Sequence, residues 1–294
     1  MRAKLGGVNR GKGGIPRAAL EKAVELALEE DIGRGDLTTW VCIPEQQTAR
    51  AHVVTRQDLI LSGLPAVRRV FERVHASVQL VALHDDGSRL PARSVIAELV
   101  GPARALLAGE RVALNFLQRL SGVATATHSY VKQLPAGCRT RIADTRKTTP
   151  GLRALERYAV RCGGGYNHRG DLASGVLIKD NHVAACGSLD LAIRRARAAA
   201  PHTTRIGCEV DRLAQLDEAI AAGADWILLD NFSPDEVAAA VTSISGRAIV
   251  EASGGIQASD VPALASSGVD VISVGALTHS AAALDIGLDW MHQP

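Results

Sequence analysis

The second part of the chain alternates short β-rich runs with helical stretches, and this alternation limits the folds available to it. Six runs recur in order: RIADT, GVLIKDN, RIGCEVD, DWILLDN, AIVEASGG and VDVISVGA. Stretches such as SLDLAIRRARAAA and RLAQLDEAIAAG separate them with helical patterns. Such alternation predicts a parallel sheet with crossover helices. Because a full eightfold barrel typically takes about 250 residues, six strands in about 140 residues predict a smaller or incomplete α/β barrel.

The first part of the chain mixes α and β patterns. Apolar residues at helical spacing predict a helix after Pro16 that ends at the glycines of DIGRGD. Strands are predicted in AHVVTRQDLILSG, SVQLVAL and SVIAELVG, with a helix in LPAVRRVFERV. A long helical pattern then runs from Arg104 toward Val131. We therefore expect an α/β domain over residues 15–115, joined by residues 281–294, and a barrel over residues 116–280.

Composition and charge argue against several classes of protein. The 294 residues carry 33 Lys and Arg against 31 Asp and Glu, and only 3% are aromatic, which disfavours nucleic-acid binding by bulk charge or base stacking. Five cysteines without a C-x-x-C pair fit neither a disulfide framework nor a zinc ribbon, and indicate a reducing cytoplasm. No apolar run reaches the roughly 18 residues of a membrane span. Residues 1–14 are basic and glycine-rich without the apolar segment of a signal peptide, so we expect a disordered tail.

Polar residues follow each of the six predicted strands, where barrel enzymes place the side chains that perform chemistry. The ends read Asp144-Thr145-Arg146-Lys147, Lys179-Asp180-Asn181-His182, Glu209-Val210-Asp211, Asp230-Asn231, Glu251-Ala252-Ser253 and Ser273-Val274-Gly275. Strand ends in any barrel meet solvent, so the argument rests on the set rather than on one residue. The basic side chains, joined by His168 and Arg169, would make one mouth positive, while Glu209 and Asp230 face them. The sequence predicts a polyanionic ligand that also carries hydroxyls or a metal.

Two glycine turns near the last strands match a phosphate cradle. Ser253-Gly254-Gly255 precedes a helical pattern, and Gly275-Ala276 follows the final strand, where many barrels bind phosphate at a helix N-terminus. Each turn alone is a weak signal, but as a consecutive pair they are more specific. His168 and His182 do not have a recognised metal-ligand spacing. We favour His168 as a site residue because Arg169 follows it.

Several separated motifs resemble the quinolinate phosphoribosyltransferase family. The stretch ADTRKTTPGLRALERYAVRCGGGYNHRGDLASGVLIKDNH is similar to the family signature. EDIGRGDLTT, GERVALNFLQRLSGVATAT, CEVD, ILLDN, EASGGI and SVGALTHS agree in the family's order, from about Glu29 to Ser280. The resemblance implies the type II phosphoribosyltransferase fold, an N-terminal open-faced α/β sandwich with a C-terminal incomplete α/β barrel. It also implies a homodimer whose sites lie between one barrel and the partner's N-terminal domain.

The reaction that the resemblance implies is phosphoribosyl transfer from phosphoribosyl pyrophosphate to quinolinate with decarboxylation. It gives nicotinate mononucleotide, pyrophosphate and carbon dioxide in de novo NAD biosynthesis, with Mg²⁺. The implied substrate-binding residues are Arg111 from the partner subunit, Thr145, Arg146, Lys147, His168, Arg169, Lys179, Glu209, Asp230, Ser253, Gly254, Gly255, Gly275 and Ala276. Lys147, Glu209 and Asp230 are the implied catalytic residues. Glu209 and Asp230 would also bind Mg²⁺, directly or through ribose hydroxyls or water.

Three other functions compete with this interpretation. A molybdenum-transport-associated paralogue shares the fold and parts of the signature, but Lys179 argues against it. A Schiff-base aldolase would also place a lysine on a barrel strand beside a phosphate cradle, and borohydride trapping with a carbonyl substrate would detect it. A nucleic-acid-binding module led by the basic tail is poorly supported by the net charge of +2.

Overall fold

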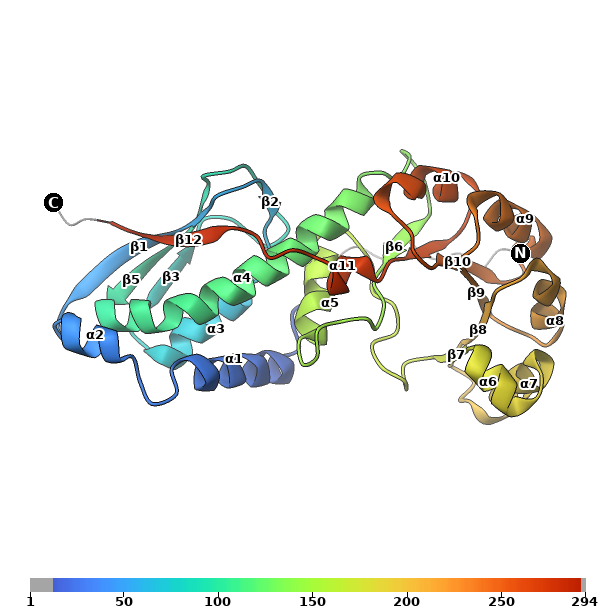
Figure 1. Cartoon of the computed structure of the whole chain (residues 1–294), viewed down its shortest axis with the longest axis horizontal. Coiled ribbons are helices and arrows are strands. Elements are labelled where there is room, and N and C mark those ends of the chain that lie inside the picture. Colours follow the sequence, from blue (N-terminus) through green and yellow to red (C-terminus); the bar gives the residue numbers. More distant parts are fainter. Residues whose placement is uncertain (1–12, 292–294) are drawn as a thin grey trace. The chain divides into compact units, whose positions relative to one another are not determined.

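The computed structural model describes residues 13–291, in which the chain forms two compact units (Figure 1). The barrel unit comprises residues 129–147 and 165–275, and the sandwich unit comprises residues 13–128, 148–164 and 276–291. The predicted tail, residues 1–14, lies outside the described residues except for Gly13 and Gly14. Among residues 13–291, no helix has the length and the apolar character needed to cross a membrane.

The sandwich unit is an antiparallel four-stranded sheet with helices on one face, as Figure 1 shows. Its strands, in sheet order, are β12 (Ile286–Trp290), β1 (Thr48–Thr55), β5 (Val95–Pro102) and β3 (Gln79–Ala82). The main helices are α1 (Arg17–Asp31), α3 (Leu64–Val74) and α4 (Ala103–Val131). Along β1, Ala51 and Val53 are buried, whereas the alternate Arg50 is exposed and His52 is partly exposed. Because successive strand residues point to opposite faces, this alternation leaves the second face of the sheet open.

Shorter elements complete the sandwich unit. They are α2 (Leu37–Cys42), β2 (Leu59–Ile60) paired with β4 (Arg89–Leu90), α5 (Arg153–Cys162) and α11 (Ala276–His279). The boundary predicted between residues 115 and 116 falls inside α4, which is continuous and buries residues from Ala103 to Thr127. The division of the chain into folding domains therefore stays a prediction, since the compact units exchange segments.

The barrel unit contains six parallel strands, and each lies in one of the six predicted runs, which confirms that part of the prediction. In sheet order they are β6 (Arg141–Ala143), β11 (Val271–Ser273), β10 (Ile249–Ser253), β9 (Trp226–Asp230), β8 (Ile206–Val210) and β7 (Val176–Ile178). Within the described residues β6 and β7 do not pair with each other, so the barrel is incomplete.

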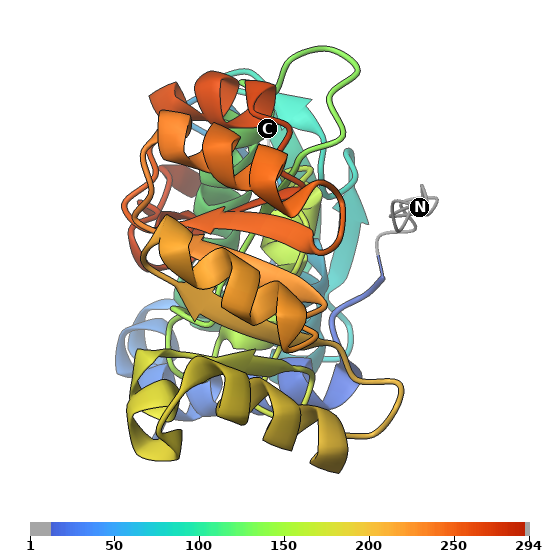
Figure 2. The same cartoon turned by 90° about the vertical axis from the view of Figure 1, so that its right-hand side faces the viewer.

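Helices cover the outer face of the parallel sheet, as Figure 2 shows from the side of the helices. They are α6 (Asp180–Cys186), α7 (Leu189–Ala199), α8 (Leu216–Ala221), α9 (Pro234–Ile244) and α10 (Val261–Ser266), with short 3₁₀ turns at Leu213–Gln215 and Ala258–Asp260. Ile206, Ile227, Leu229 and Ile272 are fully buried and form the apolar layer of the sheet. The alternate positions, Glu209, Trp226, Asp230 and Glu251, lie on the opposite, inner face.

Candidate active site at the strand ends

The parallel register brings the predicted strand-end residues to one edge of the sheet. Ser253 is the register partner of Asp230, and Ser273 is the partner of Ala143. Ile178 pairs with Cys208, so Lys179 comes level with Glu209 on the neighbouring strand. The carboxyl ends of these strands therefore meet at one edge, as the positions of the motifs predicted.

Lys179 and Glu209 form an ion pair in which Lys179 Nζ donates to Glu209 Oε2. The lysine side chain is 44% exposed, whereas the glutamate side chain is only 15% exposed. The ion pair offsets the cost of keeping the largely buried Glu209 carboxylate charged. An anionic ligand at Lys179 would compete with Glu209 for the ammonium, which has three N–H donors.

Asp144 fixes the loop that carries His168 and Arg169. It follows β6, is fully buried, and accepts hydrogen bonds from Asn167 Nδ2 at 2.6 Å and from the backbone N–H of His168 at 2.7 Å. Tyr166 extends this attachment through a parallel bridge to Ala143. The sequence placed Asp144 at a strand end but gave it no role, because only the fold brings the GGGYNHR loop beside β6.

Arg169 lies in a desolvated, positively charged environment. Burial lowers the pKa of its guanidinium, and the neighbouring charge of Arg146 lowers it further, while Asp171 and Glu251 act in the opposite direction. Its Nη1 donates to the carbonyl oxygen of Gly175 at 2.9 Å. Both effects that lower the pKa disfavour the charged form, so an anion bound beside Arg146 and Arg169 would stabilise the two cations.

The residues that follow β6 form the second basic segment of the strand-end edge. Lys147 is exposed, and its backbone N–H donates to Thr145 Oγ1 at 3.0 Å, which bends the chain directly after the strand. Two residues farther along, Thr149 donates to the buried Glu156, which also pairs with Arg119 at 2.7 Å. This network of the sandwich unit holds the chain just beyond Lys147.

Asp230 is oriented by an interlocked pair of turns. Asn231 Nδ2 donates to Asp230 Oδ2 at 2.8 Å, and its backbone N–H donates to the carbonyl oxygen of Ser253 at 2.9 Å. Asn231 has φ +59, and Gly254 beside it has φ +98. A Cβ atom on Gly254 would lie 2.2 Å from Asn231 Oδ1. Gly254 is therefore required both by its backbone conformation and by the close approach of the neighbouring turn.

The remaining predicted residues lie in different places. Gly275 and Ala276 are at the end of β11 and the start of α11. Arg111 belongs to the sandwich unit, where Arg111 and Asn115 are the exposed residues among those described in α4. His168 contacts Glu251 and Trp226, two residues of the inner face to which the sequence assigned no role.

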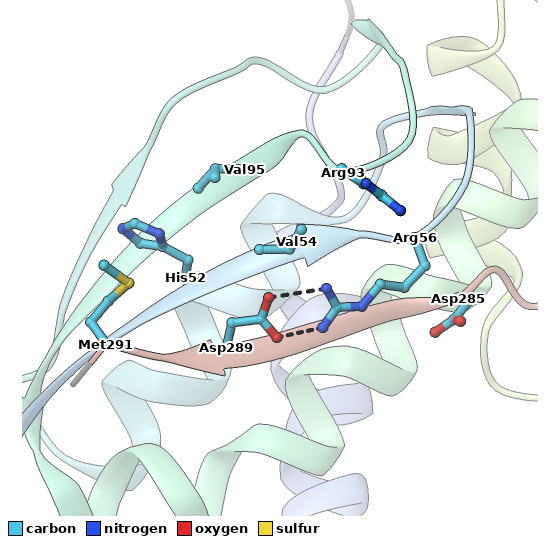
Figure 3. A pocket seen from close by; sticks show the side chains of 8 residues that line it. All are labelled: His52, Val54, Arg56, Arg93, Val95, Asp285, Asp289 and Met291. Carbon is cyan, nitrogen blue, oxygen red and sulfur yellow. Dashed lines mark hydrogen bonds and ion pairs between the residues drawn. The ribbon is translucent and has the colours of Figure 1, made fainter.

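A surface hollow lies elsewhere, on the open face of the sandwich sheet (Figure 3). Its lining includes Arg56 and Asp289, which face each other across β1 and β12 in a two-point ion pair. Hydrogen bonding to Asp289 raises the pKa of Arg56, and the same bond lowers the pKa of Asp289. These two charges neutralise each other, and the pair joins β12 to the residue that follows β1.

Known proteins resemble this chain over almost its whole length. The family model for the N-terminal domain of quinolinate phosphoribosyl transferase matches residues 36–121, and the model for its C-terminal domain matches residues 123–289. A Bacillus subtilis protein named probable nicotinate-nucleotide pyrophosphorylase (carboxylating) is 48% identical, covering 92% of this chain and 93% of its own. The human nicotinate-nucleotide pyrophosphorylase (carboxylating) is 42% identical, with coverage of 93% and 92%.

The solved structures agree with this similarity. The nicotinate-nucleotide pyrophosphorylase from Francisella tularensis superposes with a TM-score of 0.90 at 38% identity, covering 95% of this chain and 99% of that one. This structural similarity covers residues of both compact units.

Proposed function

This chain belongs to the quinolinate phosphoribosyltransferase family, and we infer from its membership and its strand-end site that it forms nicotinate mononucleotide from quinolinate. The resemblance predicted from the motifs is confirmed, as is the type II phosphoribosyltransferase fold. The enzyme transfers a phosphoribosyl group from phosphoribosyl pyrophosphate to quinolinate, with release of pyrophosphate and carbon dioxide, in NAD biosynthesis.

The observation that best supports the assignment of residues is the proximity of Arg146 to the partly desolvated Arg169 near the strand ends. Quinolinate is a flat pyridine with two adjacent carboxylates, which match planar guanidinium groups and a nearby ammonium. We assign its recognition to Arg146, Arg169 and Lys179, supported by Thr145 and His168. Lys179 would exchange its bond to Glu209 for one to a substrate carboxylate.

Phosphoribosyl pyrophosphate would bind at the neighbouring strand ends. Lys147 is exposed directly after β6 and is suited to neutralise the leaving pyrophosphate. The 5′-phosphate would rest on the glycine turns, formed by Ser253, Gly254, Gly255, Gly275 and Ala276. Glu209 and Asp230 would then bind ribose hydroxyls from β8 and β9.

Mg²⁺ is suited to the same two carboxylates. Among residues 13–291 no three His, Cys, Asp or Glu side chains gather closely enough to hold a metal ion by themselves. This fits an ion that typically uses one or two carboxylates, substrate phosphates and water. When bound, Mg²⁺ would neutralise charge on the departing pyrophosphate. Glu209 and Asp230 would hold it directly or through ribose hydroxyls or water.

The chemistry requires positioning and electrostatic stabilisation from these residues. As the bond from the anomeric carbon to pyrophosphate lengthens, the ribose becomes cationic and the pyridine nitrogen closes on that carbon. Glu209 and Asp230 would stabilise this positive charge. The quaternised ring then accepts the electron pair from the bond between C2 and its carboxylate, carbon dioxide leaves, and water supplies a proton to C2. Within the cluster of Arg146, Arg169 and Lys179, the bonds to the 3-carboxylate would hold the ring in place throughout, while those to the 2-carboxylate are lost with carbon dioxide.

We also propose a homodimer in which Arg111 completes the site of the partner subunit. Support comes from its exposure on a helix whose other faces are largely buried, because an arginine not needed for packing there is available to another chain. The free thiols of Cys42, Cys138, Cys162, Cys186 and Cys208 support a reducing compartment, and we propose the cytoplasm.

The function is tested by incubation with quinolinate, phosphoribosyl pyrophosphate and Mg²⁺, with detection of nicotinate mononucleotide and carbon dioxide. Nicotinate, which lacks the 2-carboxylate, should react at least about 100-fold more slowly, because two charge-assisted hydrogen bonds are lost. Carbon dioxide should be absent with nicotinate. Equal turnover of the two acids would contradict the assignment of the basic cluster to a dicarboxylate. Borohydride should trap no covalent adduct at Lys179.

The two glycines of the Ser253 turn offer a matched pair of variants. Gly254→Ala should weaken phosphoribosyl pyrophosphate binding more than about tenfold, because the new Cβ displaces Asn231 and with it Asp230. Gly255→Ala is the comparison: Gly255 has φ +57, but a Cβ there meets no protein atom within 4 Å, so Asn231 and Asp230 stay in place. It should show the strain of a left-handed residue, about 1–2 kcal/mol of stability, and weaken binding less than Gly254→Ala. Calorimetric titration and thermal unfolding of both variants decide this, and equal effects on binding would contradict it.

A further inference from the structure

Glu251 is a buried carboxylate of the inner face to which the proposed reaction gives no part. It lies in the middle of β10, is 3% exposed, and its Oε1 has no aligned hydrogen-bond donor. Native proteins rarely leave a buried acceptor unsatisfied, because its desolvation is costly. His168 Nε2 lies 3.3 Å from this oxygen. A small turn of the imidazole ring would complete the hydrogen bond.

The other ring nitrogen of His168 fixes the tautomer. The backbone N–H of Arg169 donates to His168 Nδ1 at 2.7 Å, so Nδ1 is an acceptor and carries no proton. In a neutral imidazole the proton must then be on Nε2, the atom that faces Glu251. Both ring nitrogens are therefore engaged by the protein itself, and neither is directed to a substrate carboxylate in this arrangement.

An indole supports the orientation of the imidazole. The rings of His168 and Trp226 meet edge to face, with centroids 5.4 Å apart and planes at 66°. Trp226 lies across the neighbouring strand at Gly207, its register partner. A Cβ atom on Gly207 would lie 1.9 Å from Trp226 Cε2, so only glycine leaves room for the indole. The ring of His168 is thus held by an indole on one side and by Glu251 at Nε2.

We propose that Glu251 is a positioning residue for quinolinate recognition, and that it acts through His168 on Arg169. The carboxylate accepts the Nε2–H of His168, the imidazole Nδ1 accepts the backbone N–H of Arg169, and the guanidinium is held at its other end by the carbonyl oxygen of Gly175. Arg169 is thereby fixed at both ends, with its remaining N–H groups available to a carboxylate. This inference rests on the proposed function, and it makes His168 a positioning residue rather than a substrate ligand.

The tautomer of His168 can be tested without any reaction. In protein labelled with ¹⁵N-histidine, the ring signals missing from His168→Gln identify His168. They should show a protonated Nε2 and an unprotonated Nδ1 at neutral pH in the substrate-free enzyme. In Glu251→Leu the Nε2 proton should exchange faster with water, whereas Glu251→Gln, whose amide oxygen can accept the same bond, should protect it. A protonated Nδ1 in the wild-type enzyme would overturn the proposal.

Ligand binding separates this role from a merely structural one. Glu251→Leu should weaken quinolinate binding about tenfold in calorimetric titration and leave phosphoribosyl pyrophosphate binding unchanged. Its unfolding temperature should change little, since leucine of similar size removes a desolvated carboxylate but leaves the His168 Nε2–H without that acceptor. Glu251→Gln should recover most of the affinity for quinolinate.

Asp270→Ala is the control, because the Asp270 carboxylate accepts the backbone N–H of Val250 at 2.9 Å near the start of β10, and alanine removes that acceptor. It should lower the unfolding temperature and leave quinolinate binding unchanged. Equal weakening toward both substrates in Glu251→Leu, or unchanged quinolinate binding, would overturn the proposal. If Glu251→Leu does not fold, Glu251→Gln decides the matter. Loss of protection of the His168 Nε2 proton in that variant would contradict the proposed hydrogen bond to residue 251. A wild-type protein that binds no quinolinate would refute the proposed function. The ring signals would still test the hydrogen bonds that link Glu251 through His168 to Arg169.

Discussion

Arg111→Ala should fold normally and lose turnover by roughly 100-fold or more, because a buried charge-assisted contact to an anionic substrate typically supplies 2–5 kcal/mol. Lys147→Ala should be inactive for a different reason, the loss of a charge that stabilises the leaving pyrophosphate. Mixing the two inactive proteins should restore activity. In a shared-site dimer, the hybrid assembles one site with Arg111 from one chain and Lys147 from the other.

The recovered activity has a defined upper limit. At equal concentrations about half of the dimers are hybrids, and one of the two sites in each hybrid is intact, so about a quarter of wild-type turnover should return. Arg17→Ala is the control, since Arg17 is an arginine of the same unit with a side chain that is 92% exposed. It should retain full activity. If native mass spectrometry shows that subunits exchange and no activity returns, Arg111 does not complete the site of a partner.

Local pattern was sufficient to predict the parallel sheet and the long helix. Each run of the second part is apolar and β-rich over a few residues, and each one became a strand at the predicted place. The helix predicted from Arg104 to Val131 is α4, Ala103–Val131, because apolar residues recur at helical spacing along its whole length. The secondary structure of these elements is therefore specified by their own residues, and tertiary contacts determine only how the elements pack together.

Among the elements that escaped prediction, β12 and α5 did so for different physical reasons. β12, Ile286–Trp290, alternates apolar residues with a glycine and an aspartate, but the run is short and Gly and Asp are depleted in strands, so its strand conformation depends on pairing with β1. In contrast, α5, Arg153–Cys162, does carry a helical signal. Its buried Leu155, Ala159 and Cys162 follow the spacing of one helix face, and this pattern was obscured by the charged residues between them.

The sequence located the edge of the sheet where the site lies but not the partners of its residues. Lys179 and Glu209 were both predicted at strand ends, yet their ion pair depends on the register between β7 and β8. Glu251 sits two residues before Ser253, and only the inward alternation of β10 distinguishes it from an ordinary strand residue. Contacts between strands distant in sequence cannot be read from the strands separately.

Lys179→Met and Asp230→Asn should impair the two halves of the reaction separately. Methionine keeps the length of the lysine stem but removes the ammonium, so quinolinate binding should weaken about tenfold or more while phosphoribosyl pyrophosphate binding stays nearly intact. Because Lys179→Met also leaves Glu209 without its ion-pair partner, Glu209→Gln should be measured alone and in combination. The quinolinate defect should persist in the double variant.

Asp230→Asn removes the charge with little other change. An asparagine at this position still offers an oxygen to Asn231 Nδ2, which donates to Asp230 Oδ2 in the present structure, so the interlocked turns should remain. The lost charge acts on the cationic ribose of the transition state, and turnover should therefore fall about 10- to 100-fold with quinolinate binding little altered. Titration of each variant with each substrate, beside turnover rates, separates the two roles. If Lys179→Met and Asp230→Asn weakened both substrates equally, the two residues would support the strand ends in general, and their separate assignment to quinolinate and to the ribose would be wrong.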